Sequence, residues 1–179
     1  MTFREATRVD LPWIVRLLAN DPIAAGRESL GGDGQAEAAA ESAGGAVGGA
    51  AGAGVPAAYY TAFEAIEKDP NNSVIVAELG GEIAGCLQLT YIPGLTYTGG
   101  ERAQIEGVRV AAEQRGRGIG QLMVGWAIEQ AKARGCRLVQ LTTDRQRPES
   151  IRFYQKIGFR PSHMGMKYHL DVSETSEPG

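Results

Sequence analysis

The feature that most constrains this chain is a short run of arginine and glycine, Gln114-Arg115-Gly116-Arg117-Gly118-Ile119-Gly120. The residues before it, 105–110, alternate between apolar and polar side chains, which predicts a strand. The residues after it carry apolar side chains at the spacing of a buried helix face, namely Ile119, Leu122, Met123, Trp126 and Ala127. The run therefore lies at the turn between a strand and a helix.

A turn of this kind can bind an anion. The first N–H groups of a helix have no partner within the helix, and the helix dipole is positive at that end. Glycine lacks a Cβ, so a ligand can come close to the backbone, and Arg115 and Arg117 add positive charge. The G-x-G-x-G spacing matches neither the P-loop nor the dinucleotide-binding motif. We expect a site for phosphate or pyrophosphate; the alternative is a tight turn with solvated arginines.

A second motif, Phe153-Tyr154-Gln155-Lys156-Ile157-Gly158-Phe159, follows after one predicted strand. The first run resembles motif A of the GNAT superfamily of N-acetyltransferases, and the second is similar to the F-Y-x-x-x-G-F signature of that family. The resemblance covers residues 73–170, is weaker from Thr2, and does not include 31–54. It implies an acyltransferase that moves an acetyl group from acetyl-CoA, its co-substrate, directly to a primary amine.

The resemblance also implies which residues contact acetyl-CoA. The turn would anchor the pyrophosphate through Arg115, Gly116, Arg117, Gly118, Ile119 and Gly120. The strand before it would hold the pantetheine arm and the thioester carbonyl through Val108, Arg109 and Val110. Where the family commonly has asparagine and alanine before F-Y, this chain has Arg147 and Ser150. We include both among the expected co-substrate contacts.

Two residues are the candidates for proton transfer. Tyr154 is the expected general acid: with a pKa of about 10 its phenol is neutral at pH 7 and can give its proton to a thiolate, whose thiol has a usual pKa of about 8.5. The alternative is a half-buried helix tyrosine. Glu106 is the expected general base, and the alternative is a salt bridge to Arg102 or Arg109. His163 is a rival base. Contacts with the acceptor are expected from Glu28, Tyr91, Arg102 and His163.

The pattern of elements indicates the fold class. Predicted strands cover 2–6, 73–79, 82–91, 102–110, 136–143 and 159–170, and predicted helices follow Asp10, Pro56, Gly118 and Pro148. This order matches the GNAT architecture: an α/β (α+β) fold with a central mixed, mostly antiparallel β-sheet and helices on both faces. We expect a single domain over 1–179, with a glycine- and alanine-rich insertion at 31–54 and a polar tail from 171.

Composition excludes several classes of function. The net charge is −3, and no basic stripe indicates nucleic-acid binding. The two cysteines give neither a disulfide framework nor metal-ligand spacing, so no metal is expected. No signal peptide or membrane span is recognisable, so we expect a cytoplasmic protein with no membrane partner. The expected partner is a small-molecule amine. A non-catalytic acyl-CoA-binding module, a protein N-acetyltransferase and a homodimer are left open.

Overall fold

The computed structural model describes residues 1–20, 54–168 and 170. The chain divides into two compact units, Met1–Leu141 and Thr142–Gly179, and each is described by itself. The single domain over 1–179 stays a prediction. The insertion expected at 31–54 lies outside the described residues except for Gly54, and so does the tail from 171.

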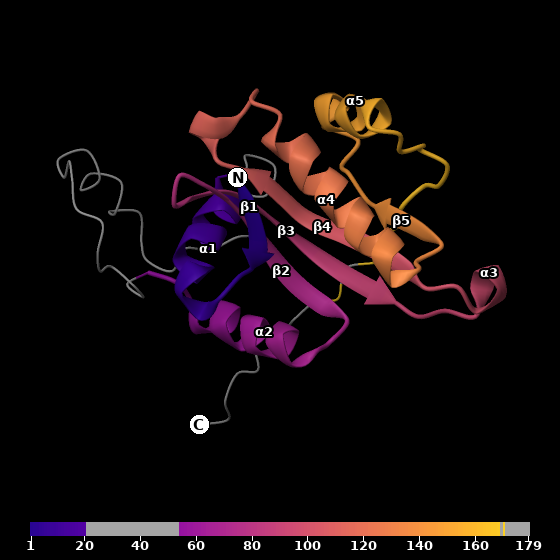
Figure 1. Cartoon of the computed structure of the whole chain (residues 1–179), viewed down its shortest axis with the longest axis horizontal. Coiled ribbons are helices and arrows are strands. Elements are labelled where there is room, and N and C mark those ends of the chain that lie inside the picture. Colours follow the sequence, from indigo (N-terminus) through magenta and orange to yellow (C-terminus); the bar gives the residue numbers. More distant parts are fainter. Residues whose placement is uncertain (21–53, 169, 171–179) are drawn as a thin grey trace. The chain divides into compact units, whose positions relative to one another are not determined.

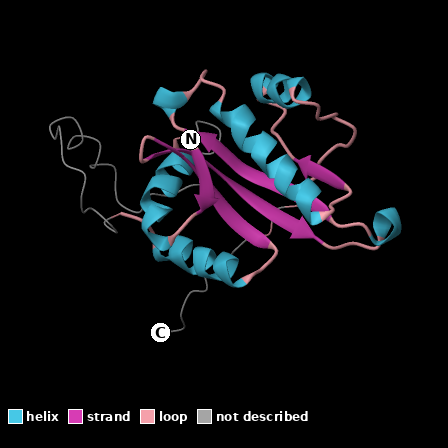
Figure 2. Ribbon diagram, in the orientation of Figure 1, coloured by secondary structure: helices cyan, strands magenta, loops and turns pink. Residues whose placement is uncertain are grey.

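The first unit contains one five-stranded sheet in the order β1-β2-β3-β4-β5 (Figures 1 and 2). Its strands are β1 (Thr2–Glu5), β2 (Asn72–Leu79), β3 (Glu82–Ile92), β4 (Arg102–Val110) and β5 (Leu138–Leu141). All neighbours pair antiparallel except β4 and β5, which are parallel. The prediction of a mixed, mostly antiparallel sheet is therefore confirmed.

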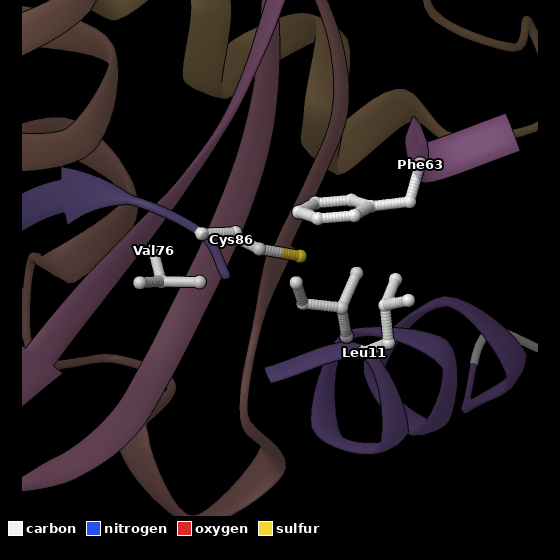
Figure 3. Close-up of a cluster of buried hydrophobic side chains, with 6 residues drawn as sticks. Leu11, Phe63, Val76 and Cys86 are labelled. Carbon is white, nitrogen blue, oxygen red and sulfur yellow. The ribbon is translucent and has the colours of Figure 1, made fainter. Parts of the chain in front are cut away.

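Helices cover both faces of this sheet. Helices α1 (Leu11–Ala19) and α2 (Ala57–Lys68) pack on one face, where Leu11 and Phe63 meet Val76 and Cys86 (Figure 3). Helix α4 (Ile119–Arg134) packs on the other face, where Trp126 stacks near Phe3 with ring centroids 5.6 Å apart. The described residues of this unit also form three shorter elements, η1 (Arg8–Asp10), α3 (Thr96–Gly99) and η3 (Ala112–Gln114).

The buried face of α4 differs from the expected one. Ile119, Met123 and Ala127 are buried as predicted, but Leu122 is 53% exposed and Val124 is fully buried. Apolar residues occur around most of this helix, so their spacing alone does not decide which side turns toward the sheet. The close approach of α4 at Gly85 decides it: a Cβ there would lie 2.7 Å from the Met123 sulfur.

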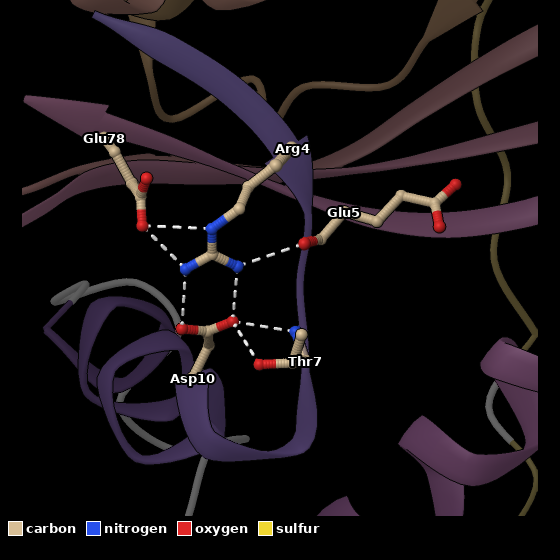
Figure 4. A network of polar contacts seen from close by, with 5 residues as sticks. All are labelled: Arg4, Glu5, Thr7, Asp10 and Glu78. Atoms are coloured by element: carbon tan, nitrogen blue, oxygen red, sulfur yellow. Dashed lines mark hydrogen bonds and ion pairs between the residues drawn. The ribbon is translucent and has the colours of Figure 1, made fainter.

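Asp10 precedes α1 as expected, but its carboxylate makes no capping bond to that helix and instead belongs to the capping box of η1. It accepts hydrogen bonds from the Arg4 guanidinium at 2.7 and 3.0 Å and from the backbone N–H of Thr7 at 2.7 Å (Figure 4). The same guanidinium donates to Glu78 on β2. This network ties β1 to the start of α1 and to β2.

The second unit contains helix α5 (Pro148–Lys156). The prediction of a final strand or hairpin over 159–170 is wrong, because the described residues of this segment form no strand. Its alternating side chains are exposed, at Met164, Met166, Tyr168 and Leu170. Alternation predicts which side chains share a face, but a strand also needs a neighbouring backbone to bond with, and none pairs with this segment in the described part of the chain.

Candidate functional site

The arginine and glycine run forms an open turn at the start of α4. Gly116 and Gly118 have φ of 74° and 78°, the left-handed region that favours glycine. No atom lies within 4 Å of where a Cβ would stand at either position. The turn is therefore open on its outer side, so that a ligand can reach its backbone.

The helix start supplies hydrogen-bond donors to this turn. The first helical bond joins the N–H of Leu122 to the carbonyl of Gly118 at 3.1 Å. The N–H groups of Ile119, Gly120 and Gln121 precede that bond and belong to the unpaired set at any helix start. Arg115 and Arg117 are exposed, and their guanidinium groups bond to the carbonyl of Val110 and the side chain of Gln114. Neither forms an ion pair with a described residue, so both charges are available to an anion.

Strands β4 and β5 separate just before the turn. Their parallel pairing runs from Arg102 with Leu138 to Ile105 with Leu141, where β5 ends. Strand β4 continues to Val110 and stays paired to β3 on its other side. The backbone of 106–110 thus has no partner strand on its β5 side within the described residues. This edge can donate and accept hydrogen bonds along an extended ligand.

A bulge in β4 changes which side chains face each way. Gln88 lies opposite Glu106 and Cys86 lies opposite Arg109, so β4 has one extra residue between these pairs. Gly107 has φ of 58° within this segment. The bulge places Arg109 opposite Cys86, which is 2% exposed. Burial raises the pKa of the Cys86 thiol to about 12, so this thiol is not an acyl-carrying nucleophile.

Glu106 is the first residue of β4 beyond the pairing with β5. Its side chain is exposed, and it forms no ion pair or side-chain hydrogen bond with any residue that the structure describes. The alternative, a salt bridge from Glu106 to Arg102 or Arg109, is therefore not formed. An available carboxylate at the point where the strands part can accept a proton from a bound amine.

The residues expected to contact the acceptor are not all brought together. Arg102 lies four residues before Glu106 on β4, on the same face of the sheet. Tyr91 lies opposite Ala103 and so points to the other face, where Arg134 stacks on its ring at 4.0 Å. His163 is an exposed residue of the second unit, with Nδ1 2.8 Å from the Ser162 hydroxyl. Glu28 lies outside the described residues.

Tyr154, Arg147 and Ser150 belong to the second unit. Tyr154 is half-buried on α5, in edge-to-face contact with Phe153 and Phe159 at centroid distances of 5.0 and 5.8 Å. Arg147 precedes the first residue of α5, and Ser150 lies in its first turn. Their roles toward acetyl-CoA stay predictions.

A row of uncharged polar residues was not singled out from the sequence. Asn72, Thr90, Gln104 and Gln140 lie directly opposite one another across β2, β3, β4 and β5. Each lies in a different strand, so no local motif marks the row. Only the register of four strands brings the residues into line on the face that Glu106 shares.

Neither a metal site nor a membrane-spanning helix is found among the described residues. No group of three or more His, Cys, Asp or Glu side chains among them could hold a metal ion. No helix in the described part of the chain is long and apolar enough to cross a membrane.

Comparisons with known proteins identify the family. Residues 47–159 match the model of the acetyltransferase (GNAT) family. The aminoalkylphosphonate N-acetyltransferase of Salmonella typhimurium is 30% identical over 106 residues, which cover 59% of this chain and 68% of the relative. The glucosamine 6-phosphate N-acetyltransferase of Trypanosoma brucei brucei is 32% identical over 90 residues, covering 50% and 59%. The chain therefore belongs to the GNAT family, and it is an acyltransferase.

A solved structure supports the fold over nearly the whole chain. The crystal structure of a protein described as a transcriptional regulator from Bacillus halodurans C-125 has a TM-score of 0.80 and 46% sequence identity. It covers 94% of this chain and 99% of its own. The expected GNAT fold is confirmed.

Proposed function

We propose that this protein transfers an acetyl group from acetyl-CoA to the primary amine of a small molecule. The observation that carries the proposal is the continuous path along β4 into α4. It begins at the available Glu106 carboxylate, follows the open edge of 106–110 and ends at the glycine turn. The family uses acetyl-CoA, and the two N-acetyltransferases similar to this chain are named for small amines, an aminoalkylphosphonate and glucosamine 6-phosphate.

The residues of this path suit the parts of acetyl-CoA. The turn from Arg115 to Gly120 offers backbone N–H groups, a helix start and two arginines to the pyrophosphate. The edge at Val108–Val110 offers backbone groups to the amides of the pantetheine arm and an N–H to polarise the thioester carbonyl. Arg147 and Ser150 occupy the sequence positions where the family commonly has asparagine and alanine, and we expect them to make a further contact with acetyl-CoA.

The reaction needs two proton transfers in addition to this binding. The amine nitrogen bonds to the acyl carbon while the carbon–sulfur bond breaks. The proton that the nitrogen loses passes to Glu106, directly or through water, and the departing thiolate receives a proton from Tyr154. The phenolate then regains a proton from solvent, and Glu106 releases the proton that it took from the amine. No acyl group resides on the protein at any step.

The proposal is tested by measuring thiol release from acetyl-CoA with a panel of acceptors. The panel contains primary alkylamines, amino sugars, amines that carry phosphonate or phosphate, and intact folded proteins. We expect at least one small amine to accelerate thiol release and to appear acetylated by mass spectrometry. Acetylation of folded proteins alone would contradict the acceptor class, and no acceleration by any acceptor would contradict the function.

Tyr154→Phe tests the acid. Turnover should fall while the affinity for acetyl-CoA changes little, because the variant loses only a proton donor. Tyr168→Phe is the matched control, since Tyr168 is 90% exposed and loses the same hydroxyl. Equal turnover of Tyr154→Phe and the wild type at every pH would reduce Tyr154 to a packing role.

A further inference from the structure

Among the described residues, the face of the sheet that carries Glu106 also carries Arg102, a charge without an ion-pair partner there. Arg102 and Glu106 occupy the first and fifth positions of β4, so they project to the same face with Gln104 between them. Neither forms an ion pair with any described residue. One cation and one anion thus stand about 13 Å apart along one strand, at ~3.3 Å per residue.

These charges do not serve to stabilise the sheet. Opposite charges directly across two strands stabilise a sheet by roughly 0.2–1 kcal/mol. Arg102 instead lies opposite Ile92 and Leu138, and Glu106 lies opposite Gln88. The Arg102 guanidinium lies beside Gly94, with 3.4 Å between Nη1 and the place of a Cβ on that glycine. Within the described residues Arg102 thus has no counter-charge, and its partly exposed guanidinium is available to an anionic ligand.

The surface between the two charges is polar but neutral. The Gln140 side chain donates to that of Gln104 at 2.7 Å, and the Thr90 and Gln88 side chains both donate to the side-chain oxygen Oδ1 of Asn72 at 3.1 and 3.0 Å. An amide has more donors and acceptors than one such bond uses. All five residues are partly exposed. The row can therefore bond to hydroxyl or amide groups of a molecule lying across it.

We propose that this face selects an elongated acceptor that carries an anionic group, with its amine at Glu106 and its anion at Arg102. This inference rests on the proposed function, because Glu106 marks the end of the face where the amine reacts. Arginine suits phosphonate, phosphate or carboxylate equally as a bidentate donor. The neutral row between the charges favours an acceptor with polar rather than alkyl groups in its middle.

The experiment compares two acceptors that differ only in their far end. One is a primary amine ending in a phosphonate, and the other has the same chain ending in a hydroxyl. We expect the wild type to favour the phosphonate amine in kcat/KM by about tenfold to a hundredfold, the size of a hydrogen-bonded charge contact. Arg102→Gln should lose that preference, and Arg102→Lys should recover part of it.

Lys132→Gln is the matched control. It removes one positive charge from an exposed position on α4, which packs on the opposite face. The preference should survive in this variant. A preference that survives in Arg102→Gln, or that is absent from the wild type, would overturn the inference.

Binding of both amines is measured by calorimetry as well, so that the inference and the proposed function fail separately. If acetylation is absent but the phosphonate amine binds more tightly through Arg102, the proposed function fails and the anion site stands. If both amines are acetylated equally well and bind equally well, the function stands and the anion site fails.

Discussion

At the residue scale, Glu106 and Asp10 show that the role of a carboxylate depends on its surroundings. Glu106 is exposed and has no ion pair with a described residue, whereas Asp10 is 5% exposed and receives three hydrogen bonds from Arg4 and the Thr7 N–H. The first can exchange a proton with a ligand. The second holds β1 and α1 together, so substitutions at the two sites should affect different properties.

Glu106→Gln should lower turnover by about 10²–10⁴-fold, the usual contribution of a general base. The amide keeps the shape of the side chain but cannot take the proton, so the affinity for acetyl-CoA should not change. Steady-state kinetics and calorimetry measure the two effects. His163→Ala is run beside it, and a severe loss in that variant with none in Glu106→Gln would reassign the base.

Asp10 should make stability depend on pH. Burial acts to raise the pKa of this carboxyl, but the hydrogen bonds from Arg4 and Thr7 outweigh it and hold the pKa below its usual value. The stabilisation is therefore fully present above the unfolded-state pKa of about 3.9 and is lost as pH falls through the lower folded-state pKa.

Asp10→Asn tests this dependence by urea unfolding. It should cost roughly 1–3 kcal/mol of unfolding free energy near neutral pH and weaken the loss of stability in acid. Equal stability of variant and wild type near neutral pH would show that the network contributes nothing.

At the scale of elements, the turn before α4 and the contact between β3 and α4 each depend on glycine, for different reasons. Gly118 needs a positive φ with open space around it, whereas Gly85 is buried against another element. The first condition leaves room for a ligand. The second sets how closely α4 approaches the sheet.

Gly118→Ala should weaken acetyl-CoA binding without unfolding the protein. Gly80→Ala is its control, because Gly80 has φ of 65° in the β2–β3 turn and also has no atom within 4 Å of a Cβ. Both variants incur similar backbone strain, of about 1–2 kcal/mol. Calorimetry should show lower affinity only for Gly118→Ala, and equal affinity in both variants would count against the turn as the anchor.

Gly85→Ala should destabilise the protein by about 1–3 kcal/mol, as overpacking does. Its Cβ would lie 2.7 Å from the Met123 sulfur and 2.7 Å from the backbone oxygen of Arg109, which cannot rotate away. Gly125→Ala on α4 meets no atom within 4 Å and should be neutral or stabilising. Thermal midpoints compare the two, and the opposite order would contradict the packing described.

At the scale of the whole molecule, sequence reasoning succeeded where local patterns determine the structure. The motif from Gln114 to Gly120 predicted its own turn, since glycine spacing and helix periodicity are local. The buried face of α4, the contact of Arg4 with Glu78 and the alignment of Gln104 with Gln140 depend on contacts between distant segments. The same holds for residues 159–170. Their alternating apolar side chains predicted a strand, but the pattern does not show whether a partner strand lies beside them.

The most direct test of the account is the stoichiometry of a single turnover. The protein is mixed with one equivalent of acetyl-CoA, first alone and then with the best small amine. The masses of the intact protein and of the amine are then measured by mass spectrometry. Direct transfer predicts an unmodified protein throughout and one acetylated amine for each thiol released. An acetyl group that remains on the protein, or thiol release without an acetylated amine, would contradict direct transfer.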